Sequence, residues 1–115
     1  MTYDQFSKIC AWIHKTVDTG HFSFNDCMMV FCLYFDAYRD FTGTAHPVPA
    51  GKQIAAIMEK MPFADKARTI PLEPEDYEVL IPAYFLVTSF QDCDHRIYHF
   101  FSGDIRENRY YETLY

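Results

Sequence analysis

The feature of this sequence that most constrains its fold is an unbroken apolar run of nine residues, Cys27 to Phe35. Extended to residues 24–41, the run predicts one helix with few polar side chains. These are Asn25, Asp26, Asp36, Arg39 and Asp40. A helix that is apolar around most of its circumference needs neighbours on most sides. We therefore expect an all-α fold, a compact bundle of five to six helices around a buried central helix at about 24–41.

Length and composition favour a single globular domain over residues 1–115. Half of the 115 residues are hydrophobic, which is enough for one buried core and excludes a wholly disordered chain. The longest apolar run is about half the ~20 residues that a membrane-spanning helix requires. The first residues do not show a basic stretch followed by an apolar one, as a secretory signal would. We expect no association with a membrane.

The cysteines indicate a reducing compartment. The chain has four, Cys10, Cys27, Cys32 and Cys93, and no two of them show Cys-x-x-Cys spacing. The first three fall on apolar faces of predicted helices. This pattern is typical of buried thiols in a reduced protein, so we expect a cytoplasmic location.

Capping residues and prolines place the other helices. Thr2 and Gln5 form a capping-box pattern, and Ser23 with Asp26 marks the start of the central helix. The predicted ranges are residues 3–18, residues 50–61 and a helix that begins near Pro74, with a kink or a break at Pro82.

The last 25 residues allow two interpretations. In the first, Ile97, Phe100 and Phe101 belong to a short helix, and a final helix follows Gly103. In the second, residues 96–102 and 105–114 pair as a β-hairpin, which would give an α+β fold with a winged-helix-like end. Helical spacing favours the first interpretation.

The net charge of −6 is concentrated in one segment. Between Arg68 and Arg96 there are six acidic residues and no Lys or Arg, while the other ten acids balance the ten basic residues. This segment also carries aromatic rings, an arrangement suited to a basic, partly apolar partner. The predicted partner-binding residues are Glu73, Glu75, Asp76, Tyr77, Glu78, Tyr84, Asp92 and Asp94. The alternative is that the first acids only stabilise a helix start, each by roughly 0.3–1 kcal/mol.

A second hypothesis is nucleic-acid binding by the C-terminal segment. Arginines and tyrosines alternate there, and guanidinium groups and rings can both stack on bases. The residues of this alternative site are Arg96, Tyr98, Arg106, Arg109 and Tyr110. The competing interpretation is that the arginines form ion pairs with Glu107, Glu112 or other surface acids. An acidic protein is otherwise a poor candidate for contacts with phosphates.

Metal binding and catalysis have weaker support. Cys10 with His14, and His95 with His99, each show the i, i+4 spacing of helical zinc ligands, and together they would supply four ligands if their helices faced one another. Such pairs arise easily by chance, so we predict no metal and no cofactor. The chain has no Gly-x-Ser-x-Gly elbow or comparable signature, and we do not expect an enzyme.

These observations favour a small acidic, aromatic-rich protein-interaction module, acting as a non-enzymatic regulator or inhibitor. The expected partner is a protein with a basic surface, such as a nucleic-acid-handling protein. Homodimerisation is a further alternative, because surplus aromatic surface can be buried against a second copy. In size, acidity and aromatic content the chain is similar in type to accessory proteins of mobile elements and phages.

Overall fold

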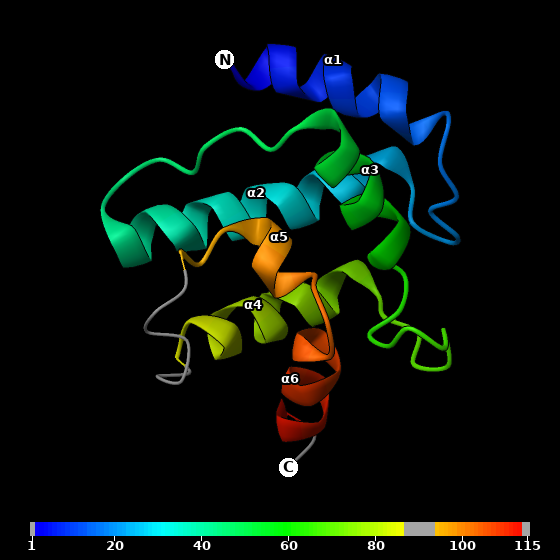
Figure 1. The fold of residues 1–115 in the computed structure, drawn as a ribbon, viewed down its shortest axis with the longest axis vertical. Coiled ribbons are helices and arrows are strands. Elements are labelled where there is room, and N and C mark those ends of the chain that lie inside the picture. Colours follow the sequence, from blue (N-terminus) through cyan, green and yellow to red (C-terminus); the bar gives the residue numbers. More distant parts are fainter. Residues whose placement is uncertain (1, 87–93, 114–115) are drawn as a thin grey trace.

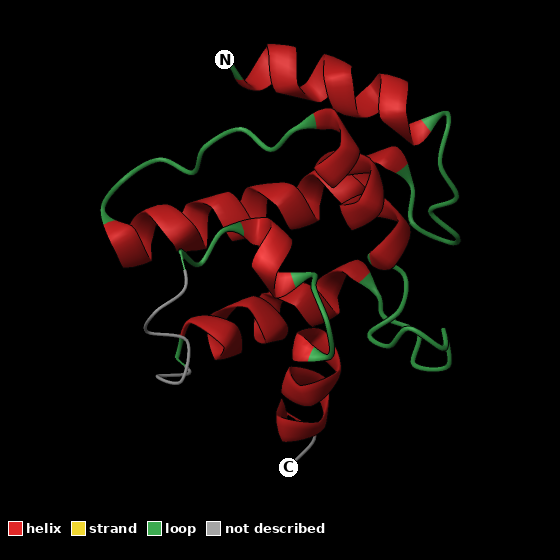
Figure 2. Ribbon diagram, viewed as in Figure 1, coloured by secondary structure: helices red, strands yellow, loops and turns green. Residues whose placement is uncertain are grey.

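The computed structural model describes residues 2–86 and 94–113 of the chain, and Figures 1 and 2 show that it is built from helices joined by loops. The elements are α1 (Tyr3–His14), α2 (Phe24–Thr42), α3 (Gly51–Lys60), the 3₁₀ turn η1 (Pro74–Asp76), α4 (Tyr77–Phe85), α5 (Ile97–Phe100) and α6 (Ile105–Thr113). The described ranges contain no strand, only an isolated bridge between Phe63 and Pro71.

The predicted all-α bundle with a central helix is confirmed. The six helices of the described ranges make a compact body with a radius of gyration of 13.4 Å. In Figure 1, α2 runs through the middle, with α1 on one side of it and α4 on the other. The buried side chains of α2 are Cys27, Met28, Val30, Phe31, Tyr34 and Tyr38. Leu33 and Phe35 are only half-buried, so one flank of this helix lies near the surface.

Local capping explains where the first helices begin. The Thr2 hydroxyl accepts a hydrogen bond from the Gln5 backbone N–H, and the Gln5 side chain accepts one from the Thr2 N–H. Ser23 and Asp26 repeat this reciprocal pair at the start of α2. Such pairs satisfy backbone N–H groups that have no partner inside the helix.

The end of α1 differs from its prediction. The helix was expected to reach residue 18, but it ends at His14. The carbonyl of Ile13 accepts hydrogen bonds from both the backbone N–H of Thr16, at 2.9 Å, and the Thr16 hydroxyl, at 2.8 Å. The threonine side chain therefore satisfies the helix end and turns the chain early.

Pro82 does not break α4, which continues through it to Phe85. A proline in this position removes one hydrogen bond, the one to the carbonyl four residues earlier, at Glu78. Both Glu78 and Pro82 lie on the exposed side of the helix, where solvent can satisfy that carbonyl. The break considered from the sequence is therefore wrong.

The β-hairpin alternative for the C-terminal segment is also wrong. Residues 97–100 and 105–113 are helical, and Gly103 lies between them with a φ of 54°. Ile97, Phe100 and Phe101 are all buried, as their helical spacing predicted. A strand would have turned neighbouring residues to opposite faces and exposed one of the two phenylalanines.

Tyr34 links three helices of the core. Its ring centroid lies 5.3 Å from that of Phe85 in α4 and 5.5 Å from that of Phe100 in α5. Its hydroxyl donates a hydrogen bond to the backbone carbonyl of His95, just before α5. The side chain is fully buried, so it fixes the C-terminal segment against α2.

No helix in residues 2–86 or 94–113 combines the length and the apolar character that crossing a membrane requires.

The role of Tyr34 can be tested by replacing it with phenylalanine. Tyr34→Phe keeps the ring but leaves the buried His95 carbonyl without this donor, which should lower the free energy of unfolding by about 1–3 kcal/mol. Tyr38→Phe is the matched control, since Tyr38 lies one turn later on α2 and its hydroxyl makes no hydrogen bond to the described residues. Urea denaturation of both variants measures the difference, and equal losses would contradict this account.

Candidate functional site

The acids at the start of the acidic segment have two different roles. The Asp76 carboxylate accepts a 2.7 Å hydrogen bond from the backbone N–H of Glu73, so it closes the η1 turn and is half-buried. Glu73, Glu75 and Glu78 are exposed, and Glu73 lies 3.7 Å from the ring of His21. Neither Glu75 nor Glu78 forms an ion pair within the described ranges. These two carboxylates are therefore available to a partner.

The two tyrosines predicted to anchor a partner are not on the surface. Tyr77 and Tyr84 are both 0% exposed. The Tyr77 hydroxyl donates to the Met61 carbonyl at 2.7 Å, and burial raises the pKa of Tyr77 to about 12. The Tyr84 hydroxyl is hydrogen-bonded to Nδ1 of His99, also at 2.7 Å. The prediction that these rings contact a partner is wrong, because the helical repeat turns both of them into the core.

The exposed side of η1 and α4 carries other apolar groups instead. Val79 is 55% exposed and Leu86 is 81% exposed. Steps of three or four residues lead from Glu75 to Glu78 and Val79, and from Glu78 through Pro82 to Leu86. All of these side chains therefore lie on one side of the helix. We call this surface the outer α4 face; its residues are Glu75, Glu78, Val79, Pro82 and Leu86.

The remaining predicted acids do not join this face. Asp92 lies outside the described residues. Asp94 is exposed, but its carboxylate accepts a 3.1 Å hydrogen bond from the backbone N–H of Arg96 and lies 3.4 Å from the Arg96 guanidinium. Asp94 therefore has a basic partner within its own loop.

The arginines of the alternative nucleic-acid site do not form one surface. Arg106 and Arg109 are only 5% and 7% exposed. Arg109 pairs with Glu112 at 2.8 Å, and Arg96 pairs with Asp94. Tyr98 is 42% exposed, whereas Tyr110 is half-buried against the core. The predicted patch of exposed stacking groups is therefore wrong for Arg106 and Arg109.

The four candidate zinc ligands are also not brought together. The ring of His14 lies 6.0 Å from Phe24, at the start of α2, whereas the ring of His95 lies 4.9 Å from Phe41, at its end. Those two phenylalanines are roughly 25 Å apart along the helix axis. Within residues 2–86 and 94–113, no three His, Cys, Asp or Glu side chains are placed to hold a metal ion.

The thiols of the helical core are poorly placed for nucleophilic chemistry. Burial raises the pKa of Cys10 and of Cys27 to about 12, so both remain protonated near neutral pH. Cys32 is half-buried and is also a free thiol. Cys93 lies outside the described residues.

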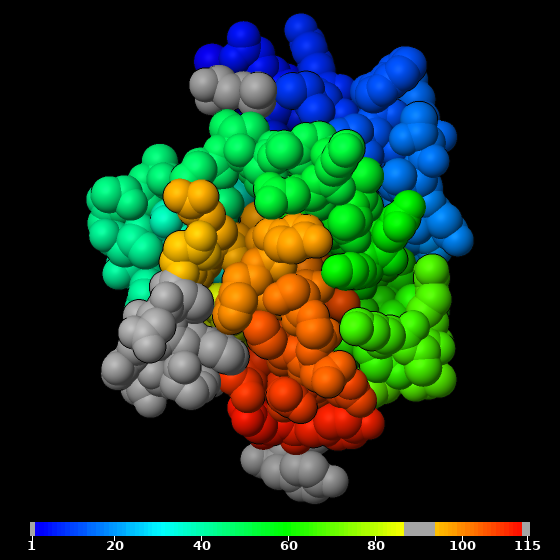
Figure 3. Space-filling view, viewed as in Figure 1, coloured from blue at the N-terminus to red at the C-terminus, as the bar shows by residue number. Residues whose placement is uncertain are grey.

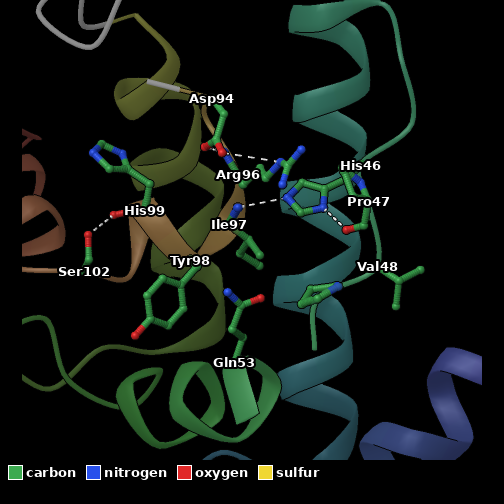
Figure 4. Close-up of a pocket in the computed structure, with 11 residues that line it drawn as sticks. His46, Pro47, Val48, Gln53, Asp94, Arg96, Ile97, Tyr98, His99 and Ser102 are labelled. Atoms are coloured by element: carbon green, nitrogen blue, oxygen red, sulfur yellow. Dashed lines mark hydrogen bonds and ion pairs between the residues drawn. The ribbon is translucent and has the colours of Figure 1, made fainter. Parts of the chain in front are cut away.

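A hollow that the sequence did not indicate lies between the loop before α3 and the segment around α5. It has a volume of about 300 Å³, and Figure 4 shows the side chains that line it. They include His46, Gln53, Asp94, Arg96, Tyr98 and Ser102. The Ser102 hydroxyl donates to the backbone carbonyl of His99 and not to its imidazole, so these two residues do not form a nucleophile–base pair.

His46 joins the two walls of this hollow. Its Nε2 atom accepts a 2.9 Å hydrogen bond from the backbone N–H of Ile97, while Nδ1 donates to the carbonyl of Pro47. This pattern requires the neutral ring, because a protonated Nε2 would direct its hydrogen at the Ile97 N–H. Burial lowers the pKa of His46, and the positive charge of Arg96 acts in the same direction.

Local sequence patterns do not indicate this contact, because His46 and Ile97 are 51 positions apart and neither belongs to a motif.

Comparisons with known protein families, with the curated proteins and with solved structures find nothing that matches this chain.

The neutral state of His46 predicts a pH dependence of stability. The folded-state pKa is lower than the ordinary value of 6.5, so the unfolded chain takes up a proton first as the pH falls. The stability due to the neutral ring is therefore complete above about pH 6.5 and decreases as the pH falls below it.

The variant His46→Gln should remove this dependence, because its side-chain oxygen can still accept from Ile97 but does not titrate. Thermal unfolding of both proteins between pH 7.5 and 5 measures the effect. Parallel losses of melting temperature in the two proteins would show that His46 is not the group responsible.

Proposed function

We propose that this protein is a non-enzymatic interaction module that binds a basic, partly apolar protein surface through its outer α4 face. The observation that carries this proposal is the pair of exposed carboxylates of Glu75 and Glu78, which lie beside the exposed side chains of Val79 and Leu86 on one side of α4. The proposal keeps the acidic segment predicted from the sequence and replaces its buried tyrosines by these aliphatic groups.

The two kinds of side chain would contribute in different ways. Burying an exposed Val or Leu against a partner stabilises a complex by roughly 1.5–3 kcal/mol for each side chain that becomes fully buried. The carboxylates would add less to the affinity, but they would accelerate association with a cationic surface and disfavour acidic partners. A surface that carries both kinds of group is suited to recognition of one partner by charge and apolar contact together.

The sign of the charge favours a partner other than a second copy of this chain. In a symmetric dimer through the outer α4 face, Glu75 and Glu78 of one copy would approach the same residues of the other. Like charges brought together across an interface are unfavourable. A cationic partner avoids this cost, and the basic groove of a nucleic-acid-handling protein is one surface of that kind.

Direct nucleic-acid binding through the C-terminal arginines has less support. Arg96 and Arg109 are paired with acids, and Arg106 is buried. Binding along the backbone of a nucleic acid depends on several cations exposed on one surface, which these three arginines do not provide. The cytoplasmic location expected from the cysteines belongs to the same proposal, since a regulator of a nucleic-acid-handling protein would act in that compartment.

The proposal predicts that reversing the charge of the outer α4 face abolishes partner binding. Tagged wild type and the Glu75→Lys/Glu78→Lys variant would be used to capture proteins from nuclease-treated lysate of the source cells. A partner captured only by the wild type would then be purified and its affinity measured. We expect binding to weaken with added salt, and Val79→Ser/Leu86→Ser to increase the dissociation constant by about tenfold or more.

The matched control is Asp36→Lys/Asp40→Lys, which makes the same change of charge at two exposed positions near the end of α2. Circular dichroism of each variant checks that the helices remain folded. Equal loss of binding in both charge-reversed variants, or recovery of nucleic acid alone, would contradict the proposal.

A further inference from the structure

A second pocket has basic walls, in contrast to the acidic outer α4 face. It has a volume of about 220 Å³ and is formed by the segment around residues 59–68 and the segment around residues 101–106. Figure 3 shows these segments side by side, the first in green and the second in orange. Its basic side chains are Lys60, Lys66, Arg68 and Arg106, and its acidic ones are Glu59 and Asp65.

Arg106 is the centre of this pocket. It is only 5% exposed, and no acid among the described residues forms an ion pair with it. All of the side-chain hydrogen bonds of Arg106 come from one terminal nitrogen, Nη1. This nitrogen donates to the backbone carbonyls of Lys60 and Phe63 and, at 3.4 Å, to the Tyr77 hydroxyl. Nε and Nη2 make no hydrogen bond to the described part of the chain.

The Arg106 side chain is largely withdrawn from water, and none of the described acids forms an ion pair with it, which is unfavourable for a charged group. Backbone carbonyls and the face of an aromatic ring provide partial compensation; the Arg106 guanidinium lies 4.9 Å from the centre of the Phe101 ring. Two of its nitrogens are nevertheless left without a protein acceptor. An anion in the pocket would supply the acceptor and the opposite charge at once.

The other cations around the pocket are positioned in the same manner. Arg68 lies 4.9 Å from the ring centre of Phe63, and Lys60 lies 5.6 Å from that of Tyr98. Burial lowers the pKa of Lys60, and the charges of Arg106 and Lys66 lower it further. The positive groups of this pocket therefore repel one another, and an anion would relieve that repulsion.

The two acids do not neutralise the site. Asp65 is engaged elsewhere, because its carboxylate accepts hydrogen bonds from the backbone N–H groups of Thr69 and Ile70 and from the Thr69 hydroxyl. Glu59 is exposed and forms no ion pair with the described residues. Four cations and two acids leave a local charge of +2 on a chain whose net charge is −6.

We infer that this basic pocket binds a phosphate group, either free inorganic phosphate or the terminal phosphate of a small ester. A phosphate carries a charge of about −1.5 to −2 at pH 7, opposite in sign to the local excess, and its oxygens match the forked donors of an arginine. The volume of about 220 Å³ holds a phosphate with a small organic group, whereas drug-sized ligands occupy larger clefts. The pocket shares no lining residue with the outer α4 face, so phosphate binding can be tested independently of the proposed function.

The test is a titration of the purified protein with inorganic phosphate and, in a second arm, with glycerol 3-phosphate, each against sodium chloride of equal ionic strength. Binding should raise the melting temperature by about 3 °C or more at saturating phosphate. In ¹H–¹⁵N spectra the largest shifts should fall on the Arg106 Nε–H and on the backbone of Gly103. Equal affinities in the two arms indicate free phosphate as the ligand, and tighter binding of the ester indicates a phosphate ester.

Arg106 also supports the fold, so the variant used is Lys66→Gln/Arg68→Gln, at two exposed positions of the pocket. It should weaken phosphate binding by about tenfold or more, because each cation contributes a charge-assisted contact. Lys8→Gln/Lys15→Gln, at exposed positions on and just after α1, is the matched control and should bind like the wild type. Equal weakening in both variants, or no shift of the Arg106 Nε–H, would overturn the inference.

Discussion

The packing of α4 against the interior decides which side chains of the acidic segment reach the surface. Tyr77 and Tyr84 face inward, and each has its hydroxyl hydrogen-bonded, to the Met61 carbonyl and to the His99 ring. Turning these rings inward necessarily turns Glu78 and Val79 outward, because the two sides of a helix cannot both face the core. The outer α4 face is therefore a consequence of core packing. A change that rotates α4 would alter the packing of the core and the composition of this face together.

The parts of the fold that could be predicted from the sequence are those determined by neighbouring residues. The capping pairs at Thr2 and Ser23 and the helical spacing after Asp94 act over three or four residues, and the structure confirms the helices that they indicate. The end of α1 depends instead on a choice between local hydrogen bonds, since the Thr16 side chain competes with the helix for the Ile13 carbonyl. Composition and periodicity do not determine the outcome of such a competition.

The sites were harder to predict because they depend on contacts between distant residues. The sequence around Arg106 and Arg109 resembles an exposed basic patch, yet both side chains turn inward. For Arg106 the reason is the two carbonyls that it binds, of Lys60 and Phe63, which lie 46 and 43 positions earlier. Nothing in the local pattern of α6 signals those acceptors. Only the fold shows that this arginine belongs with Lys66 and Arg68.

The acidic face and the basic pocket are physically connected through Tyr77. Its ring belongs to the inner side of α4, and its hydroxyl lies 3.4 Å from Nη1 of Arg106 while it donates to Met61. The negative net charge opposes the approach of anions, but salt screens charges beyond about 8 Å at physiological ionic strength. Recognition in the pocket must therefore come from short-range contacts with its cations, among them the Arg106 guanidinium. Since Tyr77 helps to hold that guanidinium in place, the packing that exposes Glu75 and Glu78 also orients the donors of the pocket.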